Sequence, residues 1–307
     1  MSRAAAVQLG LVLLALAAGC GGQTTSRSSG GPPASTPGAP AACRGARSPR
    51  RYDHVVLLVL ENHSFQEIEK SSPHLDALAA DCGLAAHYSA VAHPSLPNYL
   101  ALTSGSTQGI SSDCTDCRVQ APSIFGQLQG DWRSYLESIP AAGFTGAFSG
   151  YYAKKHNPAA YYTGIAREYA RRAVPLGSSA NGALARDLRR GTLRRFSLIV
   201  PNLCNDEHDC AITVGDHWLH TWIPLILHSP AYKSGRTLLV ITYDEGADIG
   251  NRVYTVAVNP SIPPGTIIRT PLTHYSLLKT VQQLLRLPCL AHSCDTTTNS
   301  MIRGLHL

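Results

Sequence analysis

The sequence predicts an α/β domain in which helices cover both faces of a mainly parallel central sheet. Two runs, 54–60 and 237–243, are apolar along most of their length. Strands buried on both faces of a parallel sheet show such continuous apolar runs rather than alternation. Segments with helix-like spacing separate the runs, as expected when crossover helices connect parallel strands. With 307 residues, 44% of them hydrophobic, the chain can bury one large core or two small ones.

The expected elements follow one another along the chain, with residues between them that end strands and helices. Gly105 stops one helix, Pro288 stops another, and Pro201 ends a strand. We expect strands at 54–60, 144–150, 195–200, 237–243 and 253–258. We expect helices at 74–80, 97–105, 123–139, 183–190, 216–227 and 274–287.

The N-terminal segment has the features of an export signal. Residues 1–20 begin with a positive charge and continue with an apolar stretch too short for a comfortable membrane span. Small residues directly before Cys20 resemble a bacterial lipobox, so we expect a lipoprotein signal peptide that ends at a lipidated Cys20. Residues 21–42 hold no large apolar side chain and should be a disordered linker to a folded domain at 43–307. The expected location is extracytoplasmic, anchored by lipid to the cell membrane; ordinary secretion is the alternative.

Eight cysteines remain once Cys20 is set aside, and an even number in an exported chain favours disulfides. Three pairs are close enough in sequence to close small loops, which leaves a fourth, long-range pair. Zinc is the alternative because residues 114–117 have C-x-x-C spacing, but no second C-x-x-C and no paired histidines lie at finger spacing. Disulfides are favoured over zinc. Cys204–Cys210, Cys289–Cys294 and Cys114–Cys117 could close small loops and leave Cys43–Cys82, but eight cysteines allow 105 pairings and the sequence leaves the connectivity open.

The net charge of +6, with 13 histidines taken as neutral, is mild and spread along the chain. It lacks the aromatic-interleaved basic stripe of a nucleic-acid-binding protein, so we expect no nucleic-acid partner. A positive balance does suit an anionic substrate or surface. Arginines cluster in the middle third of the chain, and solvated helix faces are the simpler explanation of that cluster.

Polar side chains follow three of the expected strands at the point where each strand ends. Glu61-Asn62 follow the first, Asp206 and His208 follow the strand that ends at Pro201, and Asp244-Glu245 follow 237–243. Ligands of parallel sheets bind beyond the carboxyl ends of the strands, so these groups should converge. Carboxylate and amide oxygens suit Mg²⁺, Ca²⁺ or Mn²⁺, and added histidine widens the choice to Zn²⁺ or Fe.

The stretch HPSLPN, residues 93–98, places Ser95 at the expected start of a helix. Free N–H groups and the positive end of the helix dipole make such a start a natural phosphate site. Ser95 is then a candidate nucleophile, but a lone hydroxyl needs a base or a metal to become reactive. The alternative is that Ser95 is only the N-cap of the helix.

Five motifs occur in a characteristic order: ENHSF, HPSLPNYLALTSG, PNLCNDEHDC with GDHWL, ITYDEG and THYSLL. Together they resemble the bacterial phosphoesterase family of acid phosphatases and phospholipases C, within the alkaline-phosphatase-like superfamily. The similarity runs from Tyr52 to Leu287. The NDxHD motif and Lys155-His156 are most similar to those of short secreted acid phosphatases, including a phosphatidylinositol-phosphate phosphatase. Residues 43–307 are then the phosphoesterase catalytic domain.

The resemblance implies a role for each matching residue. Ser95 is the nucleophile, Asn98 holds a phosphate oxygen, and Asp206 and His208 are metal ligands or proton-transfer groups. Two-zinc members of the superfamily usually have a histidine after the late aspartate, where this chain has Glu245, and an Asp–His spacing of four in the middle segment. These departures favour one divalent ion of undetermined identity. The implied metal ligands are Glu61, Asn62, Asp244 and Glu245, and the implied substrate-binding residues are His93, Asn98, Lys155, His156 and His274.

The resulting hypothesis is a metal-dependent phosphomonoesterase that works through a phosphoserine intermediate, with His208 as the proton donor. Its substrates would be small phosphorylated metabolites or phosphoinositide headgroups. A phosphodiesterase of the phospholipase C type is one alternative, and a lipoprotein that binds phosphate compounds without turnover is another. The sequence holds no G-x-S-x-G or Walker A motif, which disfavours serine esterases and nucleotide hydrolases. It leaves the oligomeric state open.

Overall fold

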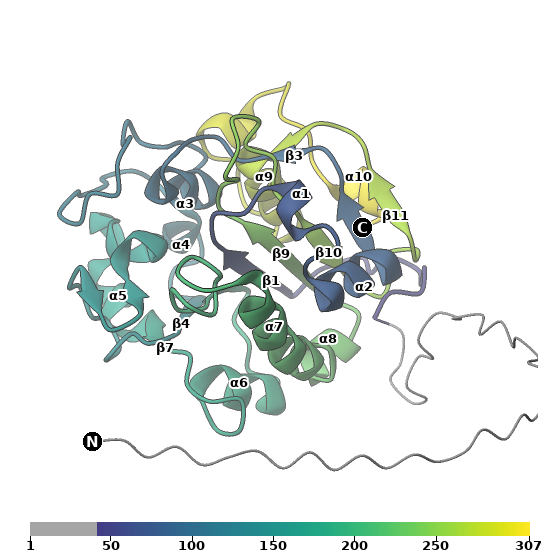
Figure 1. The fold of residues 1–307 in the computed structure, drawn as a ribbon, viewed down its shortest axis with the longest axis horizontal. Coiled ribbons are helices and arrows are strands. Elements are labelled where there is room, and N and C mark those ends of the chain that lie inside the picture. The colour runs from purple at the N-terminus through teal and green to yellow at the C-terminus, as the bar shows by residue number, and fades with distance from the viewer. Residues whose placement is uncertain (1–41) are drawn as a thin grey trace, which may run out of the picture. The chain divides into compact units, whose positions relative to one another are not determined.

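The computed structural model describes residues 42–307, and its central element is an eight-stranded sheet (Figure 1). The expected signal peptide, Cys20 and nearly all of the expected linker lie outside the described residues. The strands, in spatial order, are β11 (Thr266–Ile268), β2 (Gly83–Ala85), β10 (Val256–Val258), β9 (Thr237–Tyr243), β1 (His54–Leu60), β8 (Phe196–Val200), β4 (Trp132–Leu136) and β7 (Ala173–Pro175).

Strand β1 lies at the centre of the sheet, between β8 and β9, and is parallel to both. Only β10 runs antiparallel to its neighbours, β9 and β2. Every residue of β8 and β9 is buried, which explains their continuous apolar sequence. The mainly parallel sheet predicted from the sequence is confirmed.

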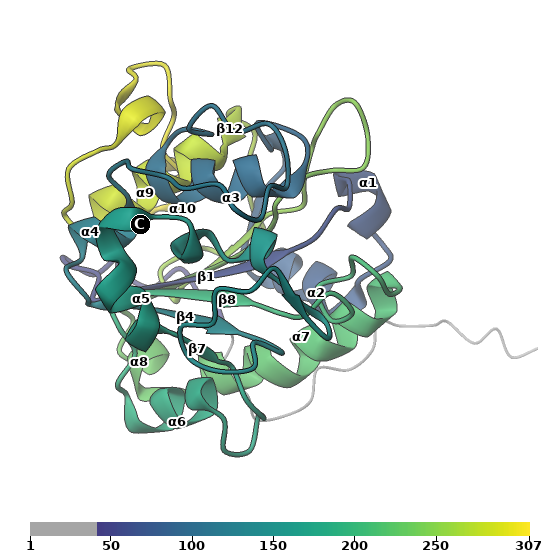
Figure 2. The same cartoon turned by 90° about the vertical axis from the view of Figure 1, so that its left-hand side faces the viewer.

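Helices cover both faces of the sheet, as predicted (Figure 2). One face carries α3 and α9, which pack against each other. The other carries α6, α7 and α8, with α2 packed against α7. The bounds are α2 (Pro73–Asp81), α3 (Ser95–Ser104), α6 (Ala183–Arg190), α7 (Ile212–Leu227), α8 (Pro230–Lys233) and α9 (His274–Leu284), with further short helices α1 (Phe65–Ile68), α4 (Ile124–Gln127), α5 (Ala166–Arg172) and α10 (Ile302–Leu305).

The prediction of one helix at 123–139 is wrong. The segment forms α4 and then enters the sheet as β4, between β8 and β7. Its aromatic residues fit a buried strand, and pairing on both edges outweighs the local helical pattern. The strand predicted at 144–150 shrinks to β5 (Phe148–Ser149), which forms a hairpin with β6 (Tyr152–Ala153). The strand predicted at 253–258 shrinks to β10.

The four disulfides expected from the cysteine count are present, and the structure settles their pairing as Cys43–Cys82, Cys114–Cys117, Cys204–Cys210 and Cys289–Cys294. Cys43–Cys82 ties the first described residues to the end of α2, whereas Cys204–Cys210 closes the loop that carries Asp206 and His208. The zinc alternative for residues 114–117 is therefore wrong. Within the described part of the chain, no helix has the length and apolar character needed to cross a membrane.

The two kinds of disulfide should affect stability and activity differently. Loop-closure entropy predicts that replacing both cysteines of Cys43–Cys82 by serine costs about 4 kcal/mol, against about 2 kcal/mol for the shorter Cys204–Cys210 loop. Only the second change should lower kcat, because it frees the loop of Asp206 and His208. Thermal unfolding and kinetics of both double variants test this. An unchanged kcat without Cys204–Cys210 would contradict it.

Candidate active site

The three polar strand ends meet because their strands are neighbours in the sheet. Leu60 pairs with Tyr243, so Glu61 and Asp244 leave β1 and β9 at the same level. The Glu61 N–H donates to the Asp206 carbonyl at 2.9 Å, and the Asp244 N–H donates to the Leu60 carbonyl at 3.0 Å. The convergence expected from the sequence is thus present in the backbone.

Ser95 is the first residue of α3 and is fully buried. Pro94 holds the N-cap position, so the alternative that Ser95 is the N-cap is wrong. Its hydroxyl lies 3.2 Å from Glu61 Oε2 and 3.4 Å from Glu245 Oε1. It also lies 3.5 Å from the amide oxygen of Asn62, although turning that amide would let its nitrogen donate to Glu61 and Glu245. The hydroxyl therefore faces three of the four residues predicted to hold the metal.

The acidic residues of the site are buried close together, which disfavours their charged forms. Burial raises the pKa of Glu61 to about 8 and that of Asp206 to about 7. Burial first, and the charges of Glu61 and Glu245 next, raise the pKa of Asp244 well above its usual range. Asp244 Oδ2 is buried and accepts no hydrogen bond from residues 42–307, and Asp206 Oδ2 has only a 3.3 Å contact with His156 Nδ1. A divalent cation would coordinate these oxygens and stabilise the ionised carboxylates. The residues present therefore fit a site for one divalent cation.

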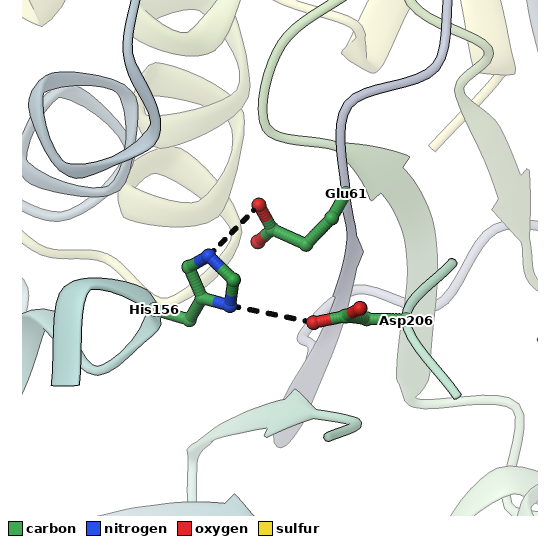
Figure 3. Close-up of side chains that lie close together, drawn as sticks. All are labelled: Glu61, His156 and Asp206. Atoms are coloured by element: carbon green, nitrogen blue, oxygen red, sulfur yellow. Dashed lines mark ion pairs between the residues drawn. The ribbon is translucent and has the colours of Figure 1, made fainter. Parts of the chain in front are cut away.

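A second arrangement shares Glu61 (Figure 3). His156 lies between two carboxylates, with Nε2 at 3.0 Å from Glu61 Oε2 and Nδ1 at 3.3 Å from Asp206 Oδ2. One ligand atom of each of these three side chains lies within 4.8 Å of the others. Burial lowers the pKa of His156, and neutral imidazole is the form that ligates metals. His156, expected beside the phosphate, is thus also placed to be a metal ligand.

A chain of polar and charged side chains runs from Asp113, which contacts the residue after Ser95, to Asp209. Lys155 Nζ is 3.1 Å from Asp113 Oδ2 and 3.1 Å from His208 Nε2. His208 Nδ1 is 2.7 Å from Asp209 Oδ1, which leaves Nε2 directed at Lys155. Burial lowers the pKa of Lys155, but Asp113 and Glu61 outweigh this and the pKa is raised, so Lys155 is a cation. Lys155 and His208 are therefore in direct contact.

Asp113 is a residue that the sequence analysis missed. Besides binding Lys155, it accepts a hydrogen bond from the Leu96 N–H at 2.9 Å, directly after the nucleophile. The Leu96 N–H is one of the N–H groups at the start of α3 that were expected to bind phosphate, and it donates its hydrogen bond to Asp113 instead. No motif signals it, because its proximity to α3 depends on the course of the loop that carries Cys114–Cys117.

Two expected substrate contacts need correction. The Asn98 amide accepts from the Val91 and Ala92 N–H groups, both at 3.0 Å, and donates to the Ala92 and Pro94 carbonyls. All its hydrogen-bonding capacity holds the turn before α3, and no donor is free for a phosphate oxygen. His274 is fully buried, with Nε2 at the Asp244 carbonyl. It supports the late acidic pair from behind and cannot reach a substrate.

His93 remains at the mouth of the site. Its side chain is 51% exposed, and Nδ1 lies 2.5 Å from Glu245 Oε2. Burial raises the pKa of Glu245, although the contact with His93 opposes this. His93 is thus an exposed imidazole that is linked to Ser95 through one residue, Glu245.

The link from Asp113 to Lys155 gives a prediction. Asp113→Asn keeps an acceptor for the Leu96 N–H but removes the charge that holds Lys155 beside His208. We expect kcat/KM to fall about 10-fold, equivalent to about 1.4 kcal/mol, with little change in thermal stability. Asp116→Asn, an exposed aspartate in the same disulfide loop, is the matched control. Equal kinetics of the two variants would show that the Asp113 charge does not act on the site.

Comparisons with known proteins show that the chain belongs to a family of phosphate-ester hydrolases. The profile of the Phosphoesterase family matches residues 69–288. A phosphatidylinositol-3-phosphatase of Mycobacterium tuberculosis is 33% identical over 77% of this chain and 78% of its own length. A phosphate-repressible acid phosphatase of Penicillium chrysogenum is 31% identical over 82% of this chain and 63% of its own length.

Solved structures agree on the fold. A protein in the alkaline phosphatase superfamily from Vibrio parahaemolyticus superposes with a TM-score of 0.54 at 12% identity, over 83% of this chain and 72% of its own. The lipoteichoic acid synthase from Listeria monocytogenes gives a TM-score of 0.58 at 11% identity, over 85% and 77%. At such low identity the similarity shows the fold alone, and this fold agrees with the one expected from the motifs.

Proposed function

The chain belongs to the Phosphoesterase family and is a phosphoric ester hydrolase, and from this premise we propose that it is a metal-dependent phosphomonoesterase acting through a phosphoserine. One observation carries the proposal: the buried Ser95 hydroxyl lies at 3.2 Å from Glu61 Oε2 and 3.4 Å from Glu245 Oε1, among the residues predicted to bind a metal. A binding protein without turnover would have no use for a hydroxyl in this position.

In the proposed reaction Ser95 Oγ bonds to phosphorus as the bond from phosphorus to the alcohol oxygen breaks. The Ser95 proton leaves toward Glu61 Oε2, its nearest acceptor. A cation bound by Glu61, Asn62, Asp244 and Glu245 would lower the pKa of the hydroxyl and offset negative charge. Lys155 Nζ turns from His208 Nε2 to the phosphoryl oxygens, and His208, in its imidazolium form, supplies the proton for the departing alkoxide from Nε2. Burial lowers the pKa of His208, so this acid form is favoured at low pH. Water then hydrolyses the phosphoserine to release phosphate and restore Ser95.

The substrate class follows from the relatives. One is named a phosphatidylinositol-3-phosphatase and another an acid phosphatase, so we propose small phosphomonoesters or phosphoinositide headgroups. Turnover of a chromogenic monoester and of the matching diester tests this. Activity on the monoester alone supports the proposal, whereas faster diester cleavage favours a phospholipase C type of enzyme. No turnover of either would favour the binding lipoprotein.

Four disulfides in the described part of the chain point to an extracellular protein. We also propose that a lipid on Cys20 anchors the protein to the membrane and that residues 21–42 link this anchor to the catalytic domain at 43–307. Detergent-phase partitioning of protein from its native host, compared with Cys20→Ser, tests the anchor. Equal partitioning into the aqueous phase would favour plain secretion.

The proton donor can be tested through the leaving group. An alkoxide needs a proton to depart, whereas nitrophenolate needs little help. His208→Asn should therefore slow alkyl phosphate hydrolysis by about 10²-fold or more, and nitrophenyl phosphate hydrolysis far less. Equal losses on both substrates, with metal content unchanged, would refute this role. His156 would then be the next candidate, since the two ring nitrogens of His274 contact Tyr88 Oη and the Asp244 carbonyl.

A further inference from the structure

Three exposed histidines gather where α2 packs against α7, outside the site described above. His74 is in the first turn of α2, and His217 and His220 are three residues apart on α7. The two helices lie side by side in both views (Figures 1 and 2). The proposed phosphatase chemistry uses none of the three.

A buried carboxylate holds the His74 ring in place. Asp216 is only 4% exposed, and its Oδ1 accepts from Ser72 Oγ at 2.6 Å and from the His74 N–H at 3.0 Å. Its Oδ2 lies 2.6 Å from His74 Nδ1. This contact places the ring proton on Nδ1 and leaves Nε2 as a free electron-pair donor. Carboxylate–histidine pairs of this kind orient metal-binding imidazoles and raise their basicity.

The three rings are neighbours, although their ligand nitrogens do not all lie within 4.8 Å of one another in the present rotamers. The ring centroids of His74 and His220 are 4.1 Å apart, and those of His217 and His220 are 6.4 Å apart. With Zn–N bonds of about 2.0–2.1 Å in tetrahedral geometry, two bound rings have centroids about 5 Å apart. The two observed spacings bracket that value. All three side chains are exposed, so rotation of the α7 rings toward His74 Nε2 meets little resistance.

We propose that His74, His217 and His220 form a second cation site that takes Zn²⁺, Ni²⁺ or Cu²⁺, with Asp216 as the positioning residue for His74. Imidazole nitrogens select these ions over Mg²⁺ and Ca²⁺. The site therefore differs in chemistry from the oxygen-rich set around Ser95, and occupation of one should not require the other.

Equilibrium dialysis of the full chain against Zn²⁺ tests the proposal. The wild-type protein should bind one more equivalent of Zn²⁺ than His74→Asn/His220→Asn, and His228→Asn, an exposed histidine directly after α7, should match the wild type. Phosphatase activity should be the same in all three proteins. Asp216→Asn should weaken the extra equivalent by about 10–100-fold.

Equal stoichiometry and affinity for Zn²⁺ in the wild type and the double variant would overturn the proposal. If that variant folds poorly, His217→Asn/His220→Asn removes two ligands without disturbing the Asp216–His74 contact. Retention of the extra equivalent in this folded variant would equally overturn it.

Discussion

Ser95→Ala should lower kcat by about 10³-fold or more while leaving the fold and the metal content nearly unchanged. The hydroxyl is the atom proposed to bond to phosphorus, and the substitution removes it. The substitution removes no helix cap, because Pro94 holds that position. Single-turnover kinetics with a phosphorylated substrate, followed by mass measurement, should show a phosphoseryl protein for the wild type and none for Ser95→Ala.

Ser104→Ala is the matched control at the other end of the same helix. Its hydroxyl is buried and donates to the Leu100 carbonyl at 2.8 Å, so this variant should lose stability but keep its kcat. If Ser95→Ala retained wild-type turnover, Ser95 would be a packing residue and the phosphoserine route would be wrong.

The bounds of helices and strands are predicted best from the sequence where burial alone decides the local structure. The bounds 54–60, 183–190 and 237–243 agree with β1, α6 and β9 because these segments have unambiguous apolar or amphipathic patterns. The convergence of Glu61 and Asp244 followed from the parallel order of strands. By contrast, β4 could not be separated from a helix, because its place between β8 and β7 is decided by long-range pairing.

The site shows the same division. Residue types at strand ends indicated the acidic centre, but hydrogen-bond partners depend on the turns around it. The Asn98 side chain makes its hydrogen bonds to the backbone of the turn before α3, and His274 contacts the backbone carbonyl of Asp244. Asp113 entered the site through a loop with no recognised motif, and His156 lies between two carboxylates rather than beside a phosphate alone.

Chelation of the metal and substitution of Asp244 should both abolish activity, but they should affect the stability of the fold differently. Chelation of the loaded wild-type protein should abolish activity and lower Tm, since a ligand present at 100 times its Kd stabilises the fold by about 2.7 kcal/mol. Asp244→Asn should also abolish metal binding and lower kcat by about 10³-fold. Without metal, however, this variant should be at least as stable as the wild type, because the substitution removes a buried carboxylate whose Oδ2 has no partner among residues 42–307.

Asp248→Asn, an exposed aspartate in the loop that follows Glu245, is the matched control and should retain metal, activity and Tm. Metal content by mass spectrometry, turnover, and thermal unfolding with and without chelator separate the outcomes. A protein that stays fully active in excess chelator and carries no metal would refute the metal-dependent mechanism. A metal-free Asp244→Asn protein that unfolds well below the metal-free wild type would show instead that Asp244 stabilises the fold by itself. Metal loss accompanied by higher metal-free stability is expected only if the buried acidic residues are arranged around a cation.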